Sequence, residues 1–348
     1  MVSEETSVLR FFVAGAIALL SLSATTPADT GRPPKTLDLV WSSGGPWTGI
    51  AADDATGRIF ALDPHGSCVE IDFDGKTVRT IRLPGAGGTK LRLAKFGPGQ
   101  DVAFVPFRVW GNRDLSVYDS AGKELWTHPT GAGIDDVWAG DLDGNGEDEV
   151  IVGYNGKTGV HVVDKAGKIR WTSTAVGDVW SVCAGHVSDD GRLQLVTSAY
   201  DGKVHVFGRD GTPREILDPG CWSQMNRIVE PSASPRQATI VVACHPSGRN
   251  ATINAITGDG AKRWSLTLPG DAEPEVETAS LAPGRPWIAI GNGSGSTYVL
   301  DTGSGAILAS LSDQEYVSEL AWAAKAGNPS PLLLVATGRE VNAYRMNP

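Results

Sequence analysis

A segment of about 45 residues recurs seven times along this chain of 348 residues. Each copy contains a short apolar stretch and a turn rich in Asp and Gly, often followed by a Gly-Lys pair and a Trp. The turns lie 47, 45, 44, 49, 44 and 44 positions apart, at Asp72, Asp119, Asp164, Gly208, Thr257, Asp301 and Arg345. A period of this length is typical of repeat architectures, in which each unit buries its apolar surface against the next.

Each repeat is predicted to form four short strands. In the third copy these strands are 135–140, 149–154, 159–164 and 168–172, where apolar and polar residues alternate. Glycine supplies 43 of the 348 residues, well above the usual share of about 7%, which favours turns and disfavours helices. Because four strands per repeat are typical of one propeller blade, the sequence predicts an all-β, seven-bladed β-propeller with four antiparallel strands in each blade.

The two ends of the chain predict how the ring closes. The seventh copy stops after its third strand, at Tyr344, and the missing fourth strand is present instead at residues 35–41, ending in Trp41. The same tryptophan ends the fourth strand of three other copies: Trp126, Trp171 and Trp264. We expect the N-terminal strand to complete the last blade, which removes two free sheet edges. A single propeller domain would then span residues 29–348.

The N-terminal region carries one apolar run, at residues 11–22. This run is too short to cross a bilayer, which takes about 20 residues, but it fits the apolar segment of a secretory signal peptide. Small residues follow it, so cleavage is expected after Ala24 or Ala28, which assigns residues 1–28 to the leader. No second long apolar run follows, so we expect a secreted or periplasmic protein without a membrane span.

The first ten residues differ from an ordinary signal peptide. Glu4 and Glu5 outweigh Arg10 there, whereas the segment before the apolar run is normally positively charged. One explanation is a start site placed too far upstream, with the true start near Val8. The alternative is a poorly charged signal or a buried N-terminal segment.

The overall charge excludes one class of partner. The net charge is −10, which argues against nucleic acid, because phosphate binding requires a basic surface. Apolar residues make up 41% of the chain, enough to form a core rather than a disordered chain. We expect a monomer that binds protein or carbohydrate.

The four cysteines give no sign of a local metal or redox site, because none forms a C-x-x-C pair. Cys221 and Cys244 flank an expected hairpin whose loop lies near residues 231–236, so they could face each other as a disulfide. Export would permit such a bond. The alternative is that they are buried free thiols.

The Asp-x-x-Gly-Lys-x-x-Trp pattern resembles the quinoprotein-like propeller repeats, which also occur in the outer-membrane assembly lipoprotein family. The resemblance covers most of the mature chain, but the pattern belongs to the blade and not to a ligand site. Quinoprotein dehydrogenases of this kind have eight blades and a vicinal cysteine pair, and this sequence has neither. We therefore expect no quinone cofactor.

One segment carries the pattern of a metal-binding loop. Residues 140–153 contain oxygen-bearing side chains at Asp141, Asp143, Asn145 and Glu149. Gly146 allows the loop to bend sharply, and the backbone carbonyl of Glu147 could contribute a further oxygen. Such a loop suits a hard cation with oxygen ligands, and its spacing is similar to the calcium loop of FG-GAP repeats, in which an Asp usually stands where this chain has Glu149. We expect one structural calcium here; the alternative is an ordinary Asp/Gly turn.

In a propeller, the links between blades and the links between second and third strands share one face, here called the funnel face. The calcium loop joins a first strand to a second, so it is expected on the opposite face. Eleven residues are predicted on the funnel face: Trp47, Asp63, His65, Trp110, Asp135, Tyr154, Trp180, Tyr200, Trp222, His245 and Tyr316. Aromatic rings beside carboxylates and amides suit sugar or peptide ligands. The alternative is that Trp47, Trp180 and Trp222 pack blades at equivalent positions.

These observations favour a binding or scaffold module that engages protein or carbohydrate through the funnel face. No catalytic motif such as G-x-S-x-G or H-E-x-x-H is present. One alternative is a polysaccharide lyase or glycoside hydrolase, with Asp135, Asp201 and Glu275 as candidate acid and base residues. Another is a structural partner in an envelope assembly.

Overall fold

The computed structural model describes most of the repeat region. The described residues are 35–111, 114–129, 131–188, 192–229, 238–245, 251–268, 276–282, 285–312 and 316–347. The expected leader, residues 1–28, lies outside them, as does Glu275. Within the described residues there is no helix long and apolar enough to cross a membrane.

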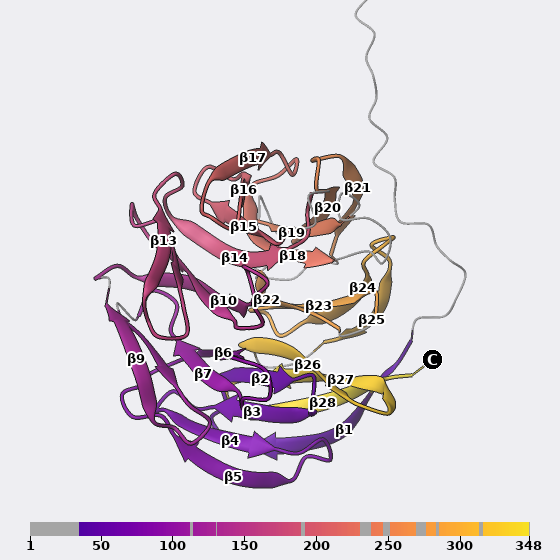
Figure 1. Ribbon diagram of the computed structural model, residues 1–348. Helices are drawn as coiled ribbons and strands as arrows, with labels where there is room; N and C mark the ends of the chain where they lie inside the picture. The colour runs from indigo at the N-terminus through magenta and orange to yellow at the C-terminus, as the bar shows by residue number, and fades with distance from the viewer. Residues whose placement is uncertain are drawn as a thin grey trace, which may run out of the picture.

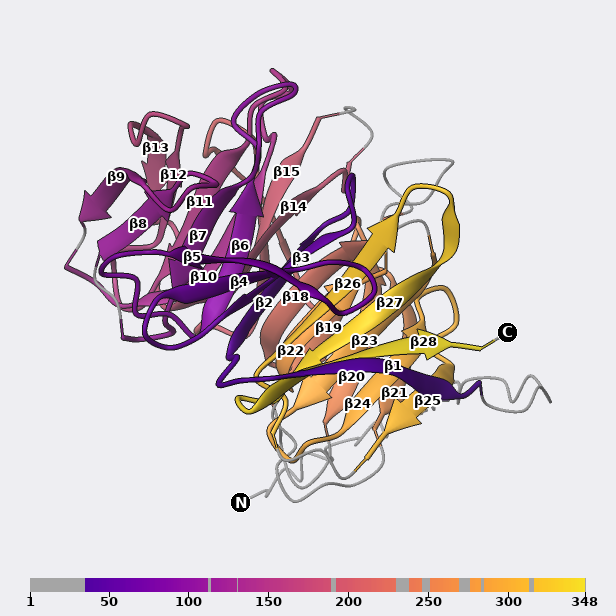
Figure 2. The ribbon, with the colours of Figure 1, turned by 90° about the horizontal axis from the view of Figure 1, so that it is seen from below.

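Seven four-stranded antiparallel sheets follow one another around a ring, in chain order (Figures 1 and 2). The first three blades consist of consecutive strands. Blade 1 is β2 (Gly49–Asp53), β3 (Arg58–Leu62), β4 (Ser67–Ile71) and β5 (Thr77–Arg82). Blade 2 is β6 (Lys90–Ala94), β7 (Ala103–Phe107), β8 (Asp114–Tyr118) and β9 (Glu124–Pro129). Blade 3 is β10 (Ile134–Gly140), β11 (Glu149–Tyr154), β12 (Val160–Val163) and β13 (Ile169–Ser173), within one residue of the predicted bounds.

The next three blades have the same order. Blade 4 is β14 (Val179–Gly185), β15 (Gln194–Ala199), β16 (Val204–Phe207) and β17 (Pro213–Leu217). Blade 5 is β18 (Ser223–Val229), β19 (Thr239–Cys244), β20 (Thr252–Thr257) and β21 (Lys262–Thr267). Blade 6 is β22 (Val276–Leu281), β23 (Trp287–Asn292), β24 (Thr297–Asp301) and β25 (Ile307–Leu311).

Blade 7 joins the two ends of the described chain. It consists of β26 (Glu319–Lys325), β27 (Asn328–Ala336) and β28 (Glu340–Met346), with β1 (Leu37–Gly44) as its outer strand. β1 runs antiparallel to β28, with Leu37 opposite Met346 and Trp41 opposite Ala343. In Figure 1 the indigo first strand accordingly lies beside the yellow last one. The predicted closure and the predicted seven-bladed, all-β fold are both confirmed.

The repeated tryptophans connect consecutive blades. The indole N–H of Trp41 donates to the carbonyl of Phe73 at 3.1 Å, in the turn of the next blade. Three further tryptophans do the same at 2.8–3.0 Å: Trp126 to Lys165, Trp171 to Arg209 and Trp264 to Thr302. Each ring covers a turn glycine with positive φ, where an added Cβ would lie only 2.5–2.7 Å from indole atoms: Gly75, Gly167, Gly211 and Gly305. The tryptophan and the turn glycine of the repeat pattern therefore form a contact between two consecutive blades.

The hydrophobic core is divided among the joints between blades. Seven clusters of buried residues occur among the described residues, and each is formed by two neighbouring sheets. The cluster that closes the ring, for example, packs Leu332 and Leu334 of β27 against Ile59 and Ile71 of blade 1. Because each cluster takes residues from two sheets, no blade forms a complete core without its neighbours. Burial of apolar area is the main stabilising contribution to folding, so the blades stabilise one another.

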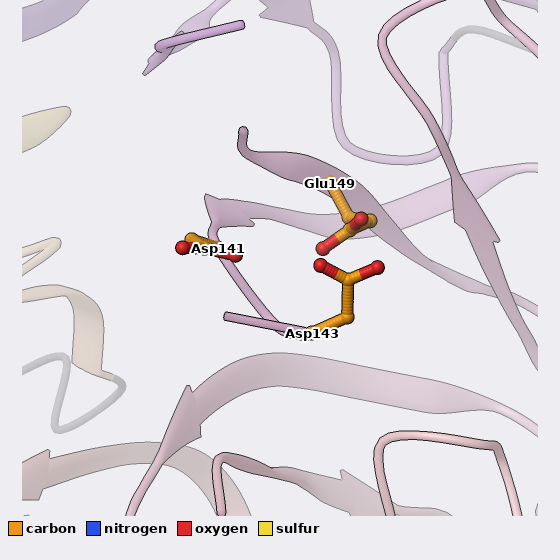
Figure 3. Close-up of side chains that lie close together, drawn as sticks. All are labelled: Asp141, Asp143 and Glu149. Carbon is orange, nitrogen blue, oxygen red and sulfur yellow. The ribbon is translucent and has the colours of Figure 1, made fainter. Parts of the chain in front are cut away.

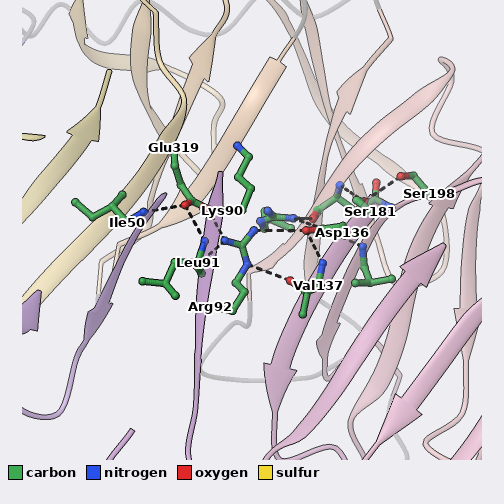
Figure 4. Close-up of polar contacts among 12 residues, drawn as sticks. Ile50, Lys90, Leu91, Arg92, Asp136, Val137, Ser181, Ser198 and Glu319 are labelled. Atoms are coloured by element: carbon green, nitrogen blue, oxygen red, sulfur yellow. Dashed lines mark hydrogen bonds and ion pairs between the residues drawn. The ribbon is translucent and has the colours of Figure 1, made fainter. Parts of the chain in front are cut away.

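Glu319 links blade 7 to the first two blades at the centre of the ring (Figure 4). Its side chain is only 1% exposed. Oε2 accepts hydrogen bonds from the backbone N–H groups of Ile50 (2.9 Å) and Leu91 (3.2 Å). Oε1 forms an ion pair with Arg92. One carboxylate therefore contacts both blades that follow the closure.

Arg92 and Asp136 extend this chain of contacts to blades 3, 4 and 5. The guanidinium of Arg92 lies 3.4 Å from the Asp136 carboxylate, which also accepts a bond from the N–H of Val182 at 3.1 Å. Arg227 of blade 5 approaches the same carboxylate at 3.9 Å. Burial alone would lower the pKa of Arg92, but the carboxylates of Glu319 and Asp136 outweigh that effect and raise it. The central charges are therefore paired.

Replacing Glu319 should show how much this network contributes. Glu319→Leu leaves two backbone N–H groups unpaired and removes one partner of the partly buried Arg92, so we expect a loss of about 3–5 kcal/mol in the free energy of unfolding. Glu319→Gln keeps an acceptor oxygen and should lose about 1.5–3 kcal/mol. Denaturant unfolding followed by tryptophan fluorescence measures both. A Leu variant within about 1 kcal/mol of the wild type would contradict the role of the network.

Candidate functional site

The predicted funnel-face residues occupy two kinds of position. Some lie at or just before an inner strand: Trp47, Asp135, Trp180, Trp222 and Tyr316. The others lie at the end of a second strand or in the link that follows it: Asp63, His65, Trp110, Tyr154, Tyr200 and His245. Because the strands of every blade are antiparallel, both kinds of link lie at the same end of the sheets. The structure therefore places the backbone of these residues at one end of the sheets.

Four aromatic side chains of blades 4 and 5 form a continuous group, here called the aromatic patch: Trp180, Tyr200, Trp222 and His245. The rings of Trp180 and Trp222 stack, with centroids 6.5 Å apart and planes 23° from parallel. His245 lies 5.9 Å from Trp180, and Tyr200 meets Trp222 edge-on at 6.2 Å. Tyr200 is 64% and Trp222 48% exposed. The patch therefore presents ring surface to solvent.

A disulfide lies directly beneath the aromatic patch. Cys221 and Cys244, the pair expected from the sequence, are bonded, with Cα atoms 5.8 Å apart. Each is followed by a member of the patch, and the N–H of His245 donates to the carbonyl of Trp222 at 2.7 Å. The ring of Trp222 covers Gly202, where a Cβ would lie 2.9 Å from it. Covalent and hydrogen-bonded contacts thus fix the relative positions of Trp222 and His245.

The three candidate funnel tryptophans are not equivalent. Taking the first paired residue of each inner strand as reference, Trp47 lies two residues before Gly49. Trp222 lies one residue before Ser223, and Trp180 lies one residue after Val179, at a β-bulge. The three tryptophans therefore do not occupy one repeated position, although Trp47 does pack against the core between blades 7 and 1. β-Bulges redirect a side chain, which accounts for the position of Trp180.

Asp135 occupies the same bulged position in blade 3, since the β10–β11 register shifts between Ile134 and Asp136. Its side chain is 6% exposed, and neither carboxylate oxygen has a hydrogen-bond partner of good geometry among the described residues. Burial raises the pKa of Asp135 to about 7, with a further increase from the charge of Asp178. The nearby Trp110 and Asn155 side chains lower this pKa but do not offset the burial.

Links from blades 2, 3 and 4 surround this acid, and we call Trp110, Asp135, Asn155 and Asp178 the Asp135 site. The N–H of Trp110 donates to the carbonyl of Ile134 at 2.8 Å, while its side chain is 73% exposed. Asp178 exchanges two hydrogen bonds with Gly156, one through its carboxylate and one through its N–H. Trp110 and Asp178 have φ of 58° and 44°, a region that non-glycine residues seldom adopt.

Asp178 is not among the residues predicted from the sequence. The signal that could have found it is its register position, one residue before an inner strand, where Trp222 stands in blade 5. Its neighbour Trp180 is identified from the sequence as an aromatic candidate, whereas a single Asp in a Gly-Asp-Val link is typical of an ordinary turn. Only the contact with blade 3 distinguishes it.

Several predicted residues have other roles. The prediction that Tyr154 lies on the funnel face is wrong. Tyr154 is the last residue of β11 and is fully buried in the core between blades 2 and 3, where the centroid of its ring lies 4.9 Å from that of His161. The carboxylate of Asp63 accepts the N–H groups of His65 and Ser67, both at 2.8 Å, so it shapes its own turn. His65 and Tyr316 are exposed on the face.

The candidate catalytic acids do not share a partner. The Asp201 carboxylate accepts hydrogen bonds from the side chain of His205 (2.9 Å) and the backbone N–H of Lys203 (3.0 Å). Asp135 lies instead beside Trp110, Asn155 and Asp178. Glu275 lies outside the described residues. A glycosidase needs two carboxyl groups that act on one bond, and Asp135 and Asp201 have no common contact among the described residues.

The expected metal loop lies between β10 and β11, on the opposite face. Ligand oxygens of Asp141, Asp143 and Glu149 lie within 4.8 Å of one another (Figure 3). Both oxygens of Asp141 accept backbone N–H groups within the loop at 2.7–2.9 Å, from Gly144, Asn145 and Gly146. Burial and the charge of Asp143 raise the pKa of Glu149.

Two basic side chains contact the same loop. Arg170 pairs with Asp143 at 2.6 Å, and Lys165 pairs with Glu147 at 2.5 Å. The predicted ligand Asn145 accepts the N–H of Glu147 through its side-chain oxygen, at 2.7 Å. The loop borders a cavity of about 420 Å³. Acids, amide and arginine thus meet in one exposed pocket.

The fold defines the class of this protein as a seven-bladed β-propeller, and comparisons with known proteins agree. Residues 114–245 match the family model described as the λ-carrageenase β-propeller domain. This segment is 132 of the 348 residues, and it contains both the aromatic patch and the Asp135 site, apart from Trp110. No curated protein matches the sequence. The resemblance to FG-GAP and quinoprotein-like repeats stays a prediction.

Solved structures of other chains share the fold. A chain from the crystal structure of BBS1N in complex with ARL6DN, soaked with lead, aligns with a TM-score of 0.63. The alignment covers 90% of this chain and 97% of that chain, at 13% sequence identity. At this identity the similarity shows the propeller fold alone.

The raised pKa of Asp135 makes a prediction about stability. Because the folded state favours the protonated acid, the stability that this group supplies is complete below about pH 4 and is lost as the pH rises through about 7. Asp135→Asn removes this loss, so we expect the variant to melt at a higher temperature than the wild type at pH 8. The gain should be roughly 2–4 °C for each kcal/mol recovered, and it should vanish toward pH 4.

The control for this measurement is Asp74→Asn, an exposed acid in the turn of blade 1. Melting temperatures of the three proteins are compared by differential scanning fluorimetry from pH 4 to pH 8. A difference between Asp135→Asn and wild type that does not change with pH would contradict the expectation.

Proposed function

We propose that this protein is an exported carbohydrate-binding propeller that holds its ligand on the funnel face. The observation that carries the proposal is the aromatic patch, where Trp180, Tyr200, Trp222 and His245 present neighbouring ring surfaces. Flat indole and phenol faces pack against the apolar faces of sugar rings, and nearby polar groups orient the hydroxyls. Asp201 and Asp178, both close in sequence to patch residues, supply such polar groups.

The family comparison supports a saccharide ligand. The matching model belongs to a propeller named for a carrageenase, and the matched residues contain the whole patch. Since a propeller fold hosts many functions, the aromatic surface and not the fold carries the argument. We favour binding over hydrolysis or elimination, because Asp135 and Asp201 contact different groups.

Two features of the chain favour a location outside the cytoplasm. The Cys221–Cys244 disulfide beneath the patch is of the kind that persists in oxidising compartments. Together with the apolar run at residues 11–22, it supports a secreted or periplasmic protein.

Removing one ring of the patch should weaken ligand binding. Trp222→Ala eliminates an exposed, stacked indole, so we expect affinity for a bound oligosaccharide to fall about tenfold or more, by analogy with aromatic residues that dominate binding surfaces. A glycan array identifies the ligand, titration calorimetry measures the affinity, and chromatography of the bound glycan tests for cleavage products.

The matched control is Trp171→Ala, on the opposite face, where the indole packs on a turn of blade 4. This variant should lose stability but keep affinity for the glycan. If no glycan binds, or if Trp222→Ala binds as well as wild type, the proposed function is wrong. Cleavage products that disappear in Asp135→Asn or Asp201→Asn would instead establish the enzymatic alternative.

We also propose that the 140–153 loop binds one calcium ion with a structural role. Its donor set of carboxylate oxygens suits a hard cation, and the three acids that lie together would hold it through Asp141, Asp143 and Glu149. The hydrogen bonds to Asp141 fix its carboxylate within the loop. A bound cation would offset the repulsion between Asp143 and Glu149, which adds to the effect of burial in raising the pKa of Glu149.

Calcium should therefore raise the melting temperature, and excess chelator should lower it by several degrees, about 2–4 °C for each kcal/mol of binding free energy. Asp143→Asn should abolish the response to calcium. Asp210→Asn, which borders the same cavity outside the acid cluster, should keep it. A wild-type protein whose melting temperature is the same with calcium and with chelator would refute the assignment.

A further inference from the structure

The Asp135 site contains two neighbouring carboxylates and no cation. Among the described residues, neither Asp135 nor Asp178 forms an ion pair with Lys, Arg or His. The third acid of the region, Asp136, differs, because its carboxylate pairs with Arg92 and accepts the N–H of Val182. Arg92 and Arg227 of the central network therefore contact the carboxylate of Asp136, and Asp135 forms no ion pair among the described residues.

An unpaired buried acid is unusual, because an ionised carboxylate loses its hydration without compensation. Asp135 is only 6% exposed, and both of its oxygens lack a hydrogen-bond partner of good geometry. The residues nearest to it, Trp110 and Asn155, belong to links on the funnel face, so the site lies at that end of blade 3. The site lacks a group that carries both positive charge and hydrogen-bond donors.

The surroundings indicate which ligand group would fit. A sulfate or carboxylate would bring a further negative charge beside Asp135 and Asp178. A neutral hydroxyl would supply no positive charge to balance Asp135 and Asp178 when they are ionised. A primary ammonium supplies three donors and a positive charge, and the exposed indole of Trp110 offers a π face of the kind that attracts cations.

We propose that the Asp135 site binds the ammonium group of an amino sugar, so that the ligand of this propeller is a polysaccharide that contains free amines. This inference rests on the proposed carbohydrate function and specifies its ligand class. The aromatic patch supplies stacking surface in blades 4 and 5, and the Asp135 site supplies charge at the joint of blades 2, 3 and 4. The similarity to a carrageenase propeller then reflects the scaffold and not a shared sulfated ligand.

The test compares three oligosaccharides of equal length by titration calorimetry, at a pH where the amine is protonated and at about 150 mM salt, which screens long-range attraction to the acidic protein. They are glucosamine oligomers, N-acetylglucosamine oligomers and sulfated galactan oligomers. We expect the wild type to bind the glucosamine oligomer about tenfold or more tightly than its acetylated counterpart, because a charge-assisted contact is lost on acetylation.

Asp135→Asn should remove that preference, so that the glucosamine oligomer binds no more tightly than its acetylated counterpart. The control is Asp54→Asn, since Asp54 is an exposed acid that lies between β2 and β3 on the opposite face. It changes the net charge equally and should keep the preference. Melting temperatures confirm that both variants are folded.

The outcomes separate this inference from the proposed function. Binding of oligosaccharides without preference for the free amine, or a preference that survives Asp135→Asn, overturns the amine site and leaves the carbohydrate function standing. Loss of the preference in Asp54→Asn as well shows general charge attraction and also overturns the site. If none of the saccharides binds and the glycan array is negative, the carbohydrate function itself fails.

Discussion

The pairing of β1 with β28 is the constraint on which the rest of the structure depends. It joins strands from opposite ends of the described chain and leaves no blade with an unpaired closing edge. The cores between blades can then all form, since each requires a neighbour on either side. Glu319 reinforces the same closure from the inside, because one carboxylate holds backbone N–H groups of blades 1 and 2 while pairing with Arg92. The funnel face is rigid only as far as this closure holds.

The fold could be predicted because its signals are local and repeated. In blades 1 and 3, a turn Asp accepts the N–H groups two and four residues later, as Asp72 does from Asp74 and Lys76. The turn glycine has positive φ, and a tryptophan from the preceding blade covers it. Each of these requirements specifies a residue type at a fixed spacing. The closing strand was predictable for the same reason, since Trp41 carries the pattern outside its own repeat.

The site was predicted less completely, because its residues come from separate links with no shared spacing. Trp180, Tyr200, Trp222 and His245 could be assigned to one face, but their mutual contacts follow from a bulge and a disulfide. Tyr154 was misjudged because a strand end can turn toward either the core or the rim. The contacts of the central network could not be predicted from the sequence, since Arg92 and Glu319 are 227 residues apart. Only the ring brings them together.

The contact between each tryptophan and the following turn has a consequence for modularity. Trp126 belongs to blade 2 but covers a glycine of blade 3, and Trp171 does the same between blades 3 and 4. The unit that repeats in the sequence is therefore offset from the unit that holds together in space. Exchanging one whole blade with a homologous propeller would break matched pairs at both of its borders. A segment bounded just before one outer-strand tryptophan and just before the next would keep each tryptophan with the glycine that it covers, but its boundaries would cut the outer strands away from the strands that they pair with.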